Sequence, residues 1–299
     1  MNVRETIRRL QREKDAIILV HNYQPPKIQD VGDFLGDSLG LAQEAAKTDA
    51  GLIVFCGVKF MAETAKILSP EKTVLLPRKD AGCPMADMIT REDLRALKAK
   101  HPDAKVVSYV NTNADVKAES DVCCTSANAV AVVKNIEADK IIFTPDQNLA
   151  SYCQRFVKKQ IIPWDGYCYV HERITVDEVL LAKRRIPDAL LLVHPECNPR
   201  VIDIADQVLS TSGMVDFAKK SDRKRFLIGT ESGLLYRLKK ENPGKEFYTA
   251  GTAKVCQSMK LTGLNDVLSA LREERYAIEL PEEIVEPARR ALEAMLEYT

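Results

Sequence analysis

The sequence contains little that would attach the chain to a membrane or to a nucleic acid. No apolar run in its 299 residues approaches the roughly 20 residues that a membrane-spanning helix needs. Its amino terminus lacks the apolar segment of a signal peptide. The 43 basic residues are balanced by 43 acidic ones, so no excess positive charge favours nucleic acid or anionic lipid. We therefore expect a cytoplasmic protein that binds neither membranes nor nucleic acid.

Several common cofactor motifs are also missing. Neither G-x-x-x-x-G-K-[ST] nor G-x-G-x-x-G occurs, which argues against ATP or NAD bound in the usual phosphate loops. No C-x-x-C pair occurs, so the eight cysteines fit neither a zinc finger nor a ferredoxin. In a cytoplasmic chain they are expected to be reduced thiols, for which metal binding or catalysis outranks disulfide formation.

What the sequence does contain is a pattern that occurs three times. Each unit has a short apolar strand that ends in polar residues. A hydroxyl residue follows 17 positions after one of these polar residues, and a cysteine in a loop comes later. The strand-end residues are His21, Tyr109 and His194, the hydroxyl residues are Ser38, Ser126 and Thr211, and the cysteines are Cys83, Cys168 and Cys256. These cysteines lie 85 and 88 residues apart, so each unit is as large as a domain.

The elements within each unit predict an α/β fold. Apolar strands expected at 16–20, 106–110 and 189–193 are typical of parallel sheets buried on both faces. Strands that alternate with helices of about ten residues predict βαβ units. Residues 28–35 are predicted to form only a connector. We expect three similar, three-layer α/β domains with short parallel sheets, related by a pseudo-threefold axis around a central active site. Their predicted ranges are 1–101 with an N-terminal helix, 102–186, and 187–299 with a C-terminal helix.

Polar residues at the strand ends predict where a ligand binds, because ligands of parallel sheets lie beyond the carboxyl ends of the strands. These residues are His21, Asn22 and Tyr23 in the first unit, Tyr109 and Asn111 in the second, and His194 and Glu196 in the third. Ser38, Ser126 and Thr211 are predicted to be N-caps of helices whose free N–H groups can bind anions. A threefold arrangement would turn all of these groups towards one cavity.

The three loop cysteines predict a metal centre. Three thiolates can hold a [4Fe–4S] cluster and leave one iron open, which can then act as a Lewis acid. A zinc ion with three thiolates and a water molecule is an alternative, and so is the simple burial of each cysteine as a small apolar residue. The remaining cysteines are predicted to be packing residues, although Cys197 could line the cavity; they are Cys56, Cys123, Cys124, Cys153 and Cys197.

Histidine and glutamate side chains are the candidates for acid–base chemistry. His21 and His194 can donate hydrogen bonds to a carboxylate or transfer protons. Glu196 lies two residues after His194, on the same face of an extended segment, and is the best candidate for a general base. Its alternative role is to cap a turn.

Taken together, nine sequence blocks resemble quinolinate synthase. They are His21-Asn-Tyr-Gln24, Gly36-Asp-Ser38, Cys83-Pro-Met-Ala86, Tyr109-Val-Asn111, Thr125-Ser-Ala-Asn128, Gly166-Tyr-Cys168, His194-Pro-Glu-Cys197, Ser210-Thr211 and Cys256. The resemblance extends from about His21 to Met259 with all blocks in order. It implies an enzyme of NAD biosynthesis that condenses iminosuccinate with dihydroxyacetone phosphate to give quinolinate, phosphate and water. It also implies functional coupling to an L-aspartate oxidase.

The resemblance further implies roles for individual residues. Cys83, Cys168 and Cys256 would hold one [4Fe–4S] cluster. The substrate or later intermediates would be bound by His21, Ser38, Tyr109, Asn111, Ser126, His194, Glu196 and Thr211. Catalysis would involve Tyr23, Tyr109, Glu196 and His194. Because Cys256 is followed by Gln257-Ser258-Met259, no local redox disulfide is expected there.

Other functions remain open from the sequence. Diphthamide-type radical enzymes and the last reductase of the isoprenoid pathway are also three-lobed proteins with three cluster cysteines, and both need an electron donor. A three-domain binding or sensing protein held together by zinc is a non-catalytic alternative.

Overall fold

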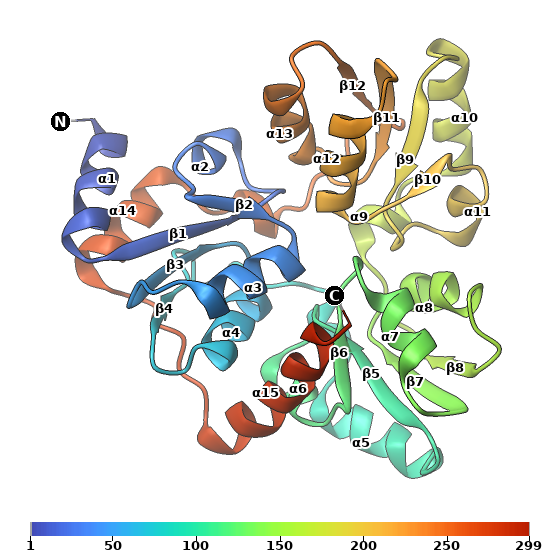
Figure 1. Ribbon diagram of the computed structural model, residues 1–299, viewed down its shortest axis with the longest axis horizontal. Coiled ribbons are helices and arrows are strands. Elements are labelled where there is room, and N and C mark those ends of the chain that lie inside the picture. The colour runs from blue at the N-terminus through green and yellow to red at the C-terminus, as the bar shows by residue number, and fades with distance from the viewer. Residues whose placement is uncertain (1, 299) are drawn as a thin grey trace.

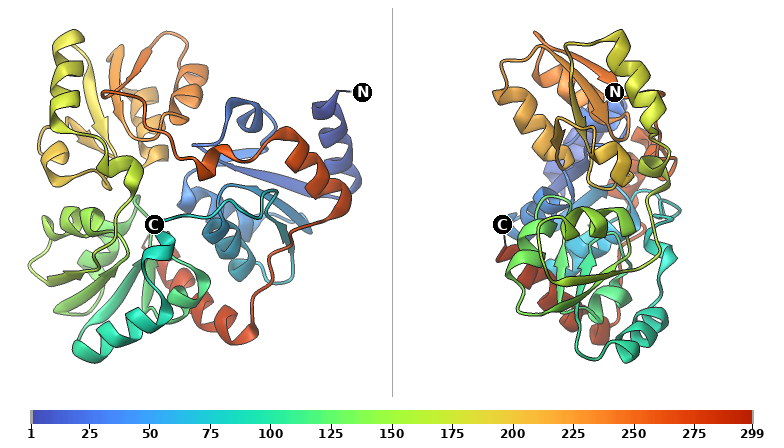
Figure 2. Two further views of the ribbon diagram at one scale, coloured as in Figure 1. Left: turned by 180° about the vertical axis from the view of Figure 1, so that it is seen from behind. Right: turned by 90° about the vertical axis from the view of Figure 1, so that its right-hand side faces the viewer.

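The computed structural model describes residues 2–298, which form an α/β protein with three separate parallel sheets. Each sheet has four strands in the same order: the second strand of the unit lies at one edge and is followed by the first, third and fourth. Figure 1 shows the three sheets around a common centre, and the side view in Figure 2 shows that the units lie in one flat arrangement. The prediction of three similar α/β units with short parallel sheets is confirmed.

The first sheet is buried on both faces. Its strands are β1 (Ala16–His21), β2 (Phe34–Gly36), β3 (Leu52–Cys56) and β4 (Thr73–Leu75), and its helices are α1 (Val3–Glu13), α2 (Pro26–Gln29), α3 (Ser38–Lys47) and α4 (Lys59–Leu68). Successive side chains of a strand point to opposite faces. Val54 therefore lies in a core cluster with Ile7 of α1, whereas Phe55 lies in another with Leu41 of α3. This explains why β3 is apolar throughout.

The other two sheets repeat this plan. The second has strands β5 (Lys105–Tyr109), β6 (Val122–Cys124), β7 (Lys140–Thr144) and β8 (Gln160–Pro163), with helices α5 (Arg91–Lys100), α6 (Ala114–Ala118), α7 (Ala129–Asn135), α8 (Gln147–Gln154) and α9 (Tyr169–Glu172). The third has strands β9 (Leu190–Val193), β10 (Gln207–Val208), β11 (Arg225–Gly229) and β12 (Glu246–Thr249), with helices α10 (Val176–Arg185), α11 (Pro199–Ile202), α12 (Thr211–Lys220) and α13 (Leu234–Glu241). Short 3-10 turns are η1 (Ala86–Met88) and η2 (Ser258–Lys260).

An aspartate marks the same point in all three sheets. The backbone N–H of Asp33 donates to the carbonyl oxygen of Ile18 at 2.9 Å, and the N–H of Ile18 donates to Asp33 Oδ2 at 2.8 Å. The same two bonds join Asp121 to Val106 and Asp206 to Leu191. Each pair fixes the first residues of an edge strand against the central strand, so the repeat extends to individual hydrogen bonds.

Two features of the repeat were not predicted. The segment 28–35 is more than a connector, because it contains the end of α2 and part of β2; β2 is too short to show an alternating pattern, and its place is fixed by pairing with β1. The short helices α2, α6, α9 and α11 were missed, and so were three longer ones that each begin eight residues after a loop cysteine: α5, α10 and α14 (Leu264–Glu273). Capping boxes at Thr90 and Thr175 start the first two of them.

The last two helices pack on units that come earlier in the chain. α14 lies beside α1, and α15 (Glu282–Leu296) packs against α6, β6 and α4. Figure 2 shows this red segment leaving the third unit and crossing the other two. The residue boundaries proposed for the three domains stay a prediction, because the tail contributes to the packing of its neighbours.

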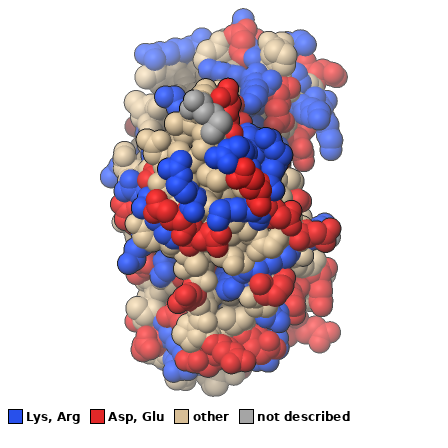
Figure 3. All heavy atoms as spheres, turned by 90° about the vertical axis from the view of Figure 1, so that its left-hand side faces the viewer, with Lys and Arg blue, Asp and Glu red and all other residues tan. Residues whose placement is uncertain are grey.

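The surface carries charges of both signs, as the charge balance of the sequence predicts. Figure 3 shows Lys and Arg side chains interspersed with Asp and Glu over the face that carries α1. Within residues 2–298, no helix combines the length and the apolar character needed to cross a membrane.

Candidate active site

The three units meet at a cavity with about 620 Å³ of space outside protein atoms. The ends of β1 and β5 and the segment that follows β9 all contribute to its wall. All twelve predicted side chains line it: Cys83, Cys168, Cys256, His21, Tyr23, Ser38, Tyr109, Asn111, Ser126, His194, Glu196 and Thr211. Their individual roles stay predictions.

One cysteine from each unit reaches this cavity. Cys83, Cys168 and Cys256 are partly exposed, whereas the other five cysteines are buried and none of them lines the cavity. Burial raises the pKa of Cys83 to about 12 and also raises the pKa values of Cys168 and Cys256. Thiolates would form here only beside a cationic group. Three soft thiol donors that line one cavity fit an iron–sulfur cluster or a zinc ion.

A carboxylate between two histidines forms the polar centre of the cavity. Glu196 Oε2 lies 2.6 Å from His171 Nδ1 and 3.4 Å from His194 Nδ1, and the two imidazole rings stack with centroids 4.5 Å apart. Burial alone would raise the pKa of Glu196, but the two histidines outweigh it and hold the pKa well below its usual value. The other oxygen, Oε1, is buried without a hydrogen-bond partner among residues 2–298. It is available to a ligand.

His171 is a cavity residue that the sequence did not single out, and the side chain of Thr230 connects it to Tyr23. His171 Nε2 lies 2.7 Å from Thr230 Oγ1, which in turn lies 2.5 Å from the hydroxyl of Tyr23. A continuous series of polar contacts therefore connects Glu196 to Tyr23. His171 sits in the four-residue helix α9, where a lone histidine forms no motif. Thr230 follows the end of β11, and its strand-end position is a signal that could have identified it.

The predicted N-caps are wrong by one or more residues. Asp37 caps α3 by accepting the N–H of Gly40 at 3.0 Å, and Ser210 caps α12 by accepting the N–H of Gly213 at 3.1 Å. α7 begins after Asn128. The error arose because Asp-Ser and Ser-Thr pairs each offer two side-chain oxygens that can cap a helix.

Ser38, Ser126 and Thr211 therefore do not act as N-caps. Thr211 Oγ1 accepts a hydrogen bond from Asn22 Nδ2 at 2.9 Å, so its own proton can be donated to a ligand. Ser126 Oγ lies 3.1 Å from His194 Nε2. Ser38 is the first residue of α3 and lines the cavity. All three residues therefore line the cavity without capping a helix.

Comparison with known proteins identifies the family. The family model described as "Quinolinate synthetase A protein" matches residues 5–297. The chain belongs to the quinolinate synthetase A family. The resemblance inferred from the nine sequence blocks is confirmed.

Individual members of the quinolinate synthetase A family are similar to the chain over nearly its whole length. A protein named quinolinate synthase from Geotalea uraniireducens (strain Rf4) is 56% identical over 294 residues, covering 98% of this chain and 97% of the relative. A protein with the same name from Alkaliphilus metalliredigens (strain QYMF) is 52% identical over 297 residues, covering 99% and 98%. A third, from Methanoregula boonei, is 53% identical over 294 residues, covering 98% of this chain and 97% of the relative.

In this member of the quinolinate synthetase A family, the tautomer of one cavity histidine follows from its contacts. His21 Nδ1 accepts the backbone N–H of Tyr23 at 3.2 Å. The neutral ring therefore carries its proton on Nε2, where it can be donated to a ligand. Burial lowers the pKa of His21 to about 4, so this neutral form persists through mildly acidic conditions.

The lowered pKa of His21 predicts a loss of stability in acid. Between pH 6.5 and about 4, the unfolded chain binds a proton at this histidine that the folded chain does not bind. The free energy of unfolding should therefore fall by about 3 kcal/mol across this range because of His21. Urea unfolding of the parent and of His21→Gln at several pH values checks this. The variant should show a shallower pH dependence, and His101→Gln is a control outside the cavity; equal slopes in parent and His21→Gln contradict the prediction.

Proposed function

We propose that the chain is a quinolinate synthase of de novo NAD biosynthesis, which condenses iminosuccinate with dihydroxyacetone phosphate to form quinolinate, phosphate and water. The observation that carries the proposal is the convergence of twelve predicted side chains from three units on one cavity, in a member of the quinolinate synthetase A family. Acid–base groups, hydroxyl donors and three thiols are all present there. These are the groups that a condensation followed by loss of phosphate and water requires.

The proposed cofactor is one [4Fe–4S] cluster held by Cys83, Cys168 and Cys256. Their partial exposure on the cavity wall, in contrast to the burial of the other cysteines, supports this assignment. When bound, a cluster with three protein ligands supplies an open iron that acts as a Lewis acid on a substrate oxygen.

The carboxylates of iminosuccinate are proposed to bind to hydroxyl and imidazole donors. Thr211 is supported by its bond from Asn22, which leaves the threonine proton free. His21 is supported by its Nε2–H, which its contact with the Tyr23 backbone leaves available. Ser38 and Ser126 contribute two more hydroxyls to the same wall. Asp37 also lies on this wall, and its negative charge helps to exclude a carboxylate from that position.

Proton transfer is proposed to involve Glu196 and two tyrosines. Glu196 is held as a carboxylate by the two histidines and presents Oε1 to the ligand, where it can accept a proton. Burial and the nearby charge of Glu196 raise the pKa of Tyr109 well above its usual value, so its phenol stays neutral and can donate. Burial also raises the pKa of Tyr23, whose hydroxyl is connected to His171 through Thr230. Asn111 Oδ1, buried without a donor among the described residues, is proposed to accept a hydrogen bond from the substrate.

The wider context follows from the same chemistry. Iminosuccinate is unstable in water, so we propose functional coupling to an L-aspartate oxidase that supplies it. We also propose that the protein is cytoplasmic and binds neither nucleic acid nor membranes. Its three proposed domains comprise residues 1–101, 102–186 and 187–299.

An anaerobic assay tests the function directly. Purified protein with reconstituted iron and sulfide is mixed with enzymatically generated iminosuccinate and dihydroxyacetone phosphate, and quinolinate is quantified by chromatography. We expect quinolinate and phosphate in equal amounts without any added electron donor. A strict requirement for an electron donor would favour the radical enzymes or the reductase instead. A colourless protein that contains zinc and forms no quinolinate would support the zinc-stapled binding protein.

A further inference from the structure

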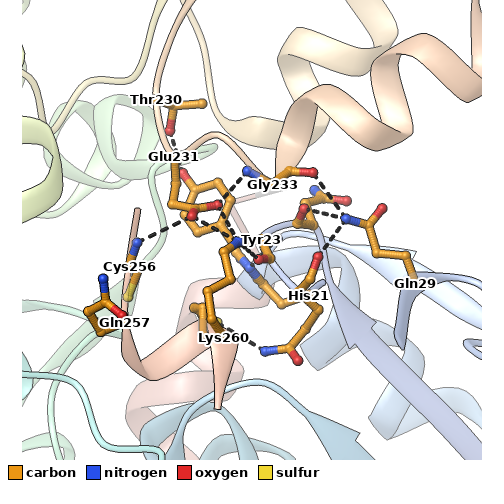
Figure 4. Close-up of polar contacts among 12 residues, drawn as sticks. His21, Tyr23, Gln29, Thr230, Glu231, Gly233, Cys256, Gln257 and Lys260 are labelled. Carbon is orange, nitrogen blue, oxygen red and sulfur yellow. Dashed lines mark hydrogen bonds and ion pairs between the residues drawn. The ribbon is translucent and has the colours of Figure 1, made fainter. Parts of the chain in front are cut away.

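Glu231 is a fully buried carboxylate next to the loop of Cys256. Its Oε1 accepts the backbone N–H of Cys256 at 3.2 Å, and its Oε2 accepts the N–H of Gly233 at 2.7 Å. Lys260 Nζ lies 2.8 Å from Oε1 and 3.0 Å from Oε2. Figure 4 shows the carboxylate at the centre of these contacts, with Cys256 on one side and Gly233 on the other. Both carboxylate oxygens of Glu231 thus accept a backbone N–H and contact Lys260.

Lys260 extends these contacts to the first unit. Its ammonium group also donates to the carbonyl oxygen of Tyr23, as Figure 4 shows. Thr230, the residue before Glu231, contacts the Tyr23 hydroxyl at 2.5 Å. Thr230 therefore contacts the side chain of Tyr23, Lys260 binds its backbone, and Glu231 holds the backbone of Cys256.

Asp146 occupies the same place in the second unit. It follows β7 as Glu231 follows β11, and its Oδ2 accepts the backbone N–H of Cys168 at 3.2 Å. Its other oxygen accepts the N–H of Leu149 at 2.7 Å and caps α8. An isolated parallel bridge joins Asp146 to Gly166, and an equivalent bridge joins Glu231 to Lys254. In each case the bridged partner lies two residues before the cysteine.

The first unit lacks such a carboxylate. The equivalent position in the first unit can be found from a hydrogen bond that all three units share. In the second and third units, the residue after the carboxylate donates its backbone N–H to the residue two before the cysteine: Gln147 to Gly166, and Ser232 to Lys254. In the first unit, Lys59 donates to Ala81 in the same way. The residue that corresponds to Asp146 and Glu231 is therefore Val58, an apolar side chain on the cavity wall. Within residues 2–298, carboxylate support at this position is seen for the loops of Cys168 and Cys256.

From this geometry we infer that Asp146 and Glu231 are positioning residues that fix the Cys168 and Cys256 loops for metal binding, and that Lys260 ties the second of them to Tyr23. The inference rests on the proposed function, since it assumes that these cysteines hold the cluster. Outer contacts of this kind orient ligands, and their loss commonly weakens metal binding by about 10- to 100-fold.

Two variants remove the proposed support. Asp146→Ser keeps a side-chain oxygen that can cap α8, but serine is too short to reach the N–H of Cys168 as well. Glu231→Leu combined with Lys260→Met replaces the buried ion pair by apolar side chains of similar size, so no charge is left unpaired. Asp121→Ser is the control for the first variant, because Asp121 accepts a backbone N–H in the same unit away from the cavity. Asp206→Leu with Lys183→Met is the control for the second.

The measurement is the rate at which the reconstituted holoprotein releases iron to a chelator in the absence of substrates, followed anaerobically by the loss of visible absorption. We expect both variants to release iron about tenfold faster than the parent and both controls to stay within about twofold of it. Release at the parental rate in a folded variant overturns the role of that carboxylate, and equal acceleration in the controls overturns both roles. Should the double variant fail to fold, Asp146→Ser decides, because its helix cap is kept. A parent that binds no iron would refute the proposed cofactor itself, whereas parental release in the variants alone leaves the proposed function intact.

Discussion

Replacing Glu196 with glutamine is expected to lower the rate of quinolinate formation by about 10³-fold while the iron content stays at the parental level. Glutamine preserves the size of the side chain but cannot accept a proton. It also removes the charge that faces His171 and His194 at 2.6 and 3.4 Å. Initial rates under anaerobic conditions, together with iron and sulfide analysis of the same samples, provide the measurement.

Glu172 offers a matched control for this variant. It lies next to His171 and accepts a hydrogen bond from Asn148 at 2.9 Å, but it does not line the cavity. Glu172→Gln should retain turnover within about threefold of the parent, because the amide oxygen of glutamine can still accept the hydrogen bond from Asn148. Normal turnover in Glu196→Gln would remove Glu196 from the mechanism. Equal losses in both variants would indicate a general disturbance of this region.

The second large effect is expected from the cavity cysteines. Replacement of Cys83, Cys168 or Cys256 by alanine should reduce the iron content from about four atoms per chain to below about one and abolish quinolinate formation. The physical reason is that each unit supplies a single thiol to the cavity, so no neighbouring thiol can take its place. Iron analysis and visible spectra of the anaerobically purified variants measure this effect.

Cys197 is the control for these three changes. It is buried, its sulfur donates to the carbonyl oxygen of Gly229 at 3.4 Å, and it does not reach the cavity. Cys197→Ala should retain the parental iron content, although the small cavity that it leaves should lower stability by about 1 kcal/mol. A full complement of iron in any of the three cavity variants would contradict the proposed ligand set, and so would loss of iron in Cys197→Ala.

The repeat was predictable because its marks are local in sequence. Apolar strands that end in polar residues recur at fixed spacing, and the position of His21 or His194 at a strand end follows from that pattern. β2 was missed because an edge strand of three residues owes its position to a partner strand and not to its own composition. Helix starts were displaced where two adjacent residues can both act as caps, as with Asp37 and Ser38.

The site was only partly predictable because some of its members are defined by tertiary contacts. His171 becomes a neighbour of Glu196 only when α9 packs against the segment after β9. Glu231 and Asp146 contact cysteines 25 and 22 residues further along the chain, and no short motif connects them. A comparison of the three units residue by residue would have aligned these two carboxylates, since both follow the third strand of their sheets.

The equivalent positions around the centre carry different residues, and this difference has a consequence for recognition. A ring of three identical subunits would have to repeat one residue at every position near its axis. Three units joined in one polypeptide are free of this requirement, so Val58, Asp146 and Glu231 can occupy matching places, as can His21, Tyr109 and His194. An asymmetric ligand in the central cavity therefore contacts three different sets of side chains, which favour a single orientation.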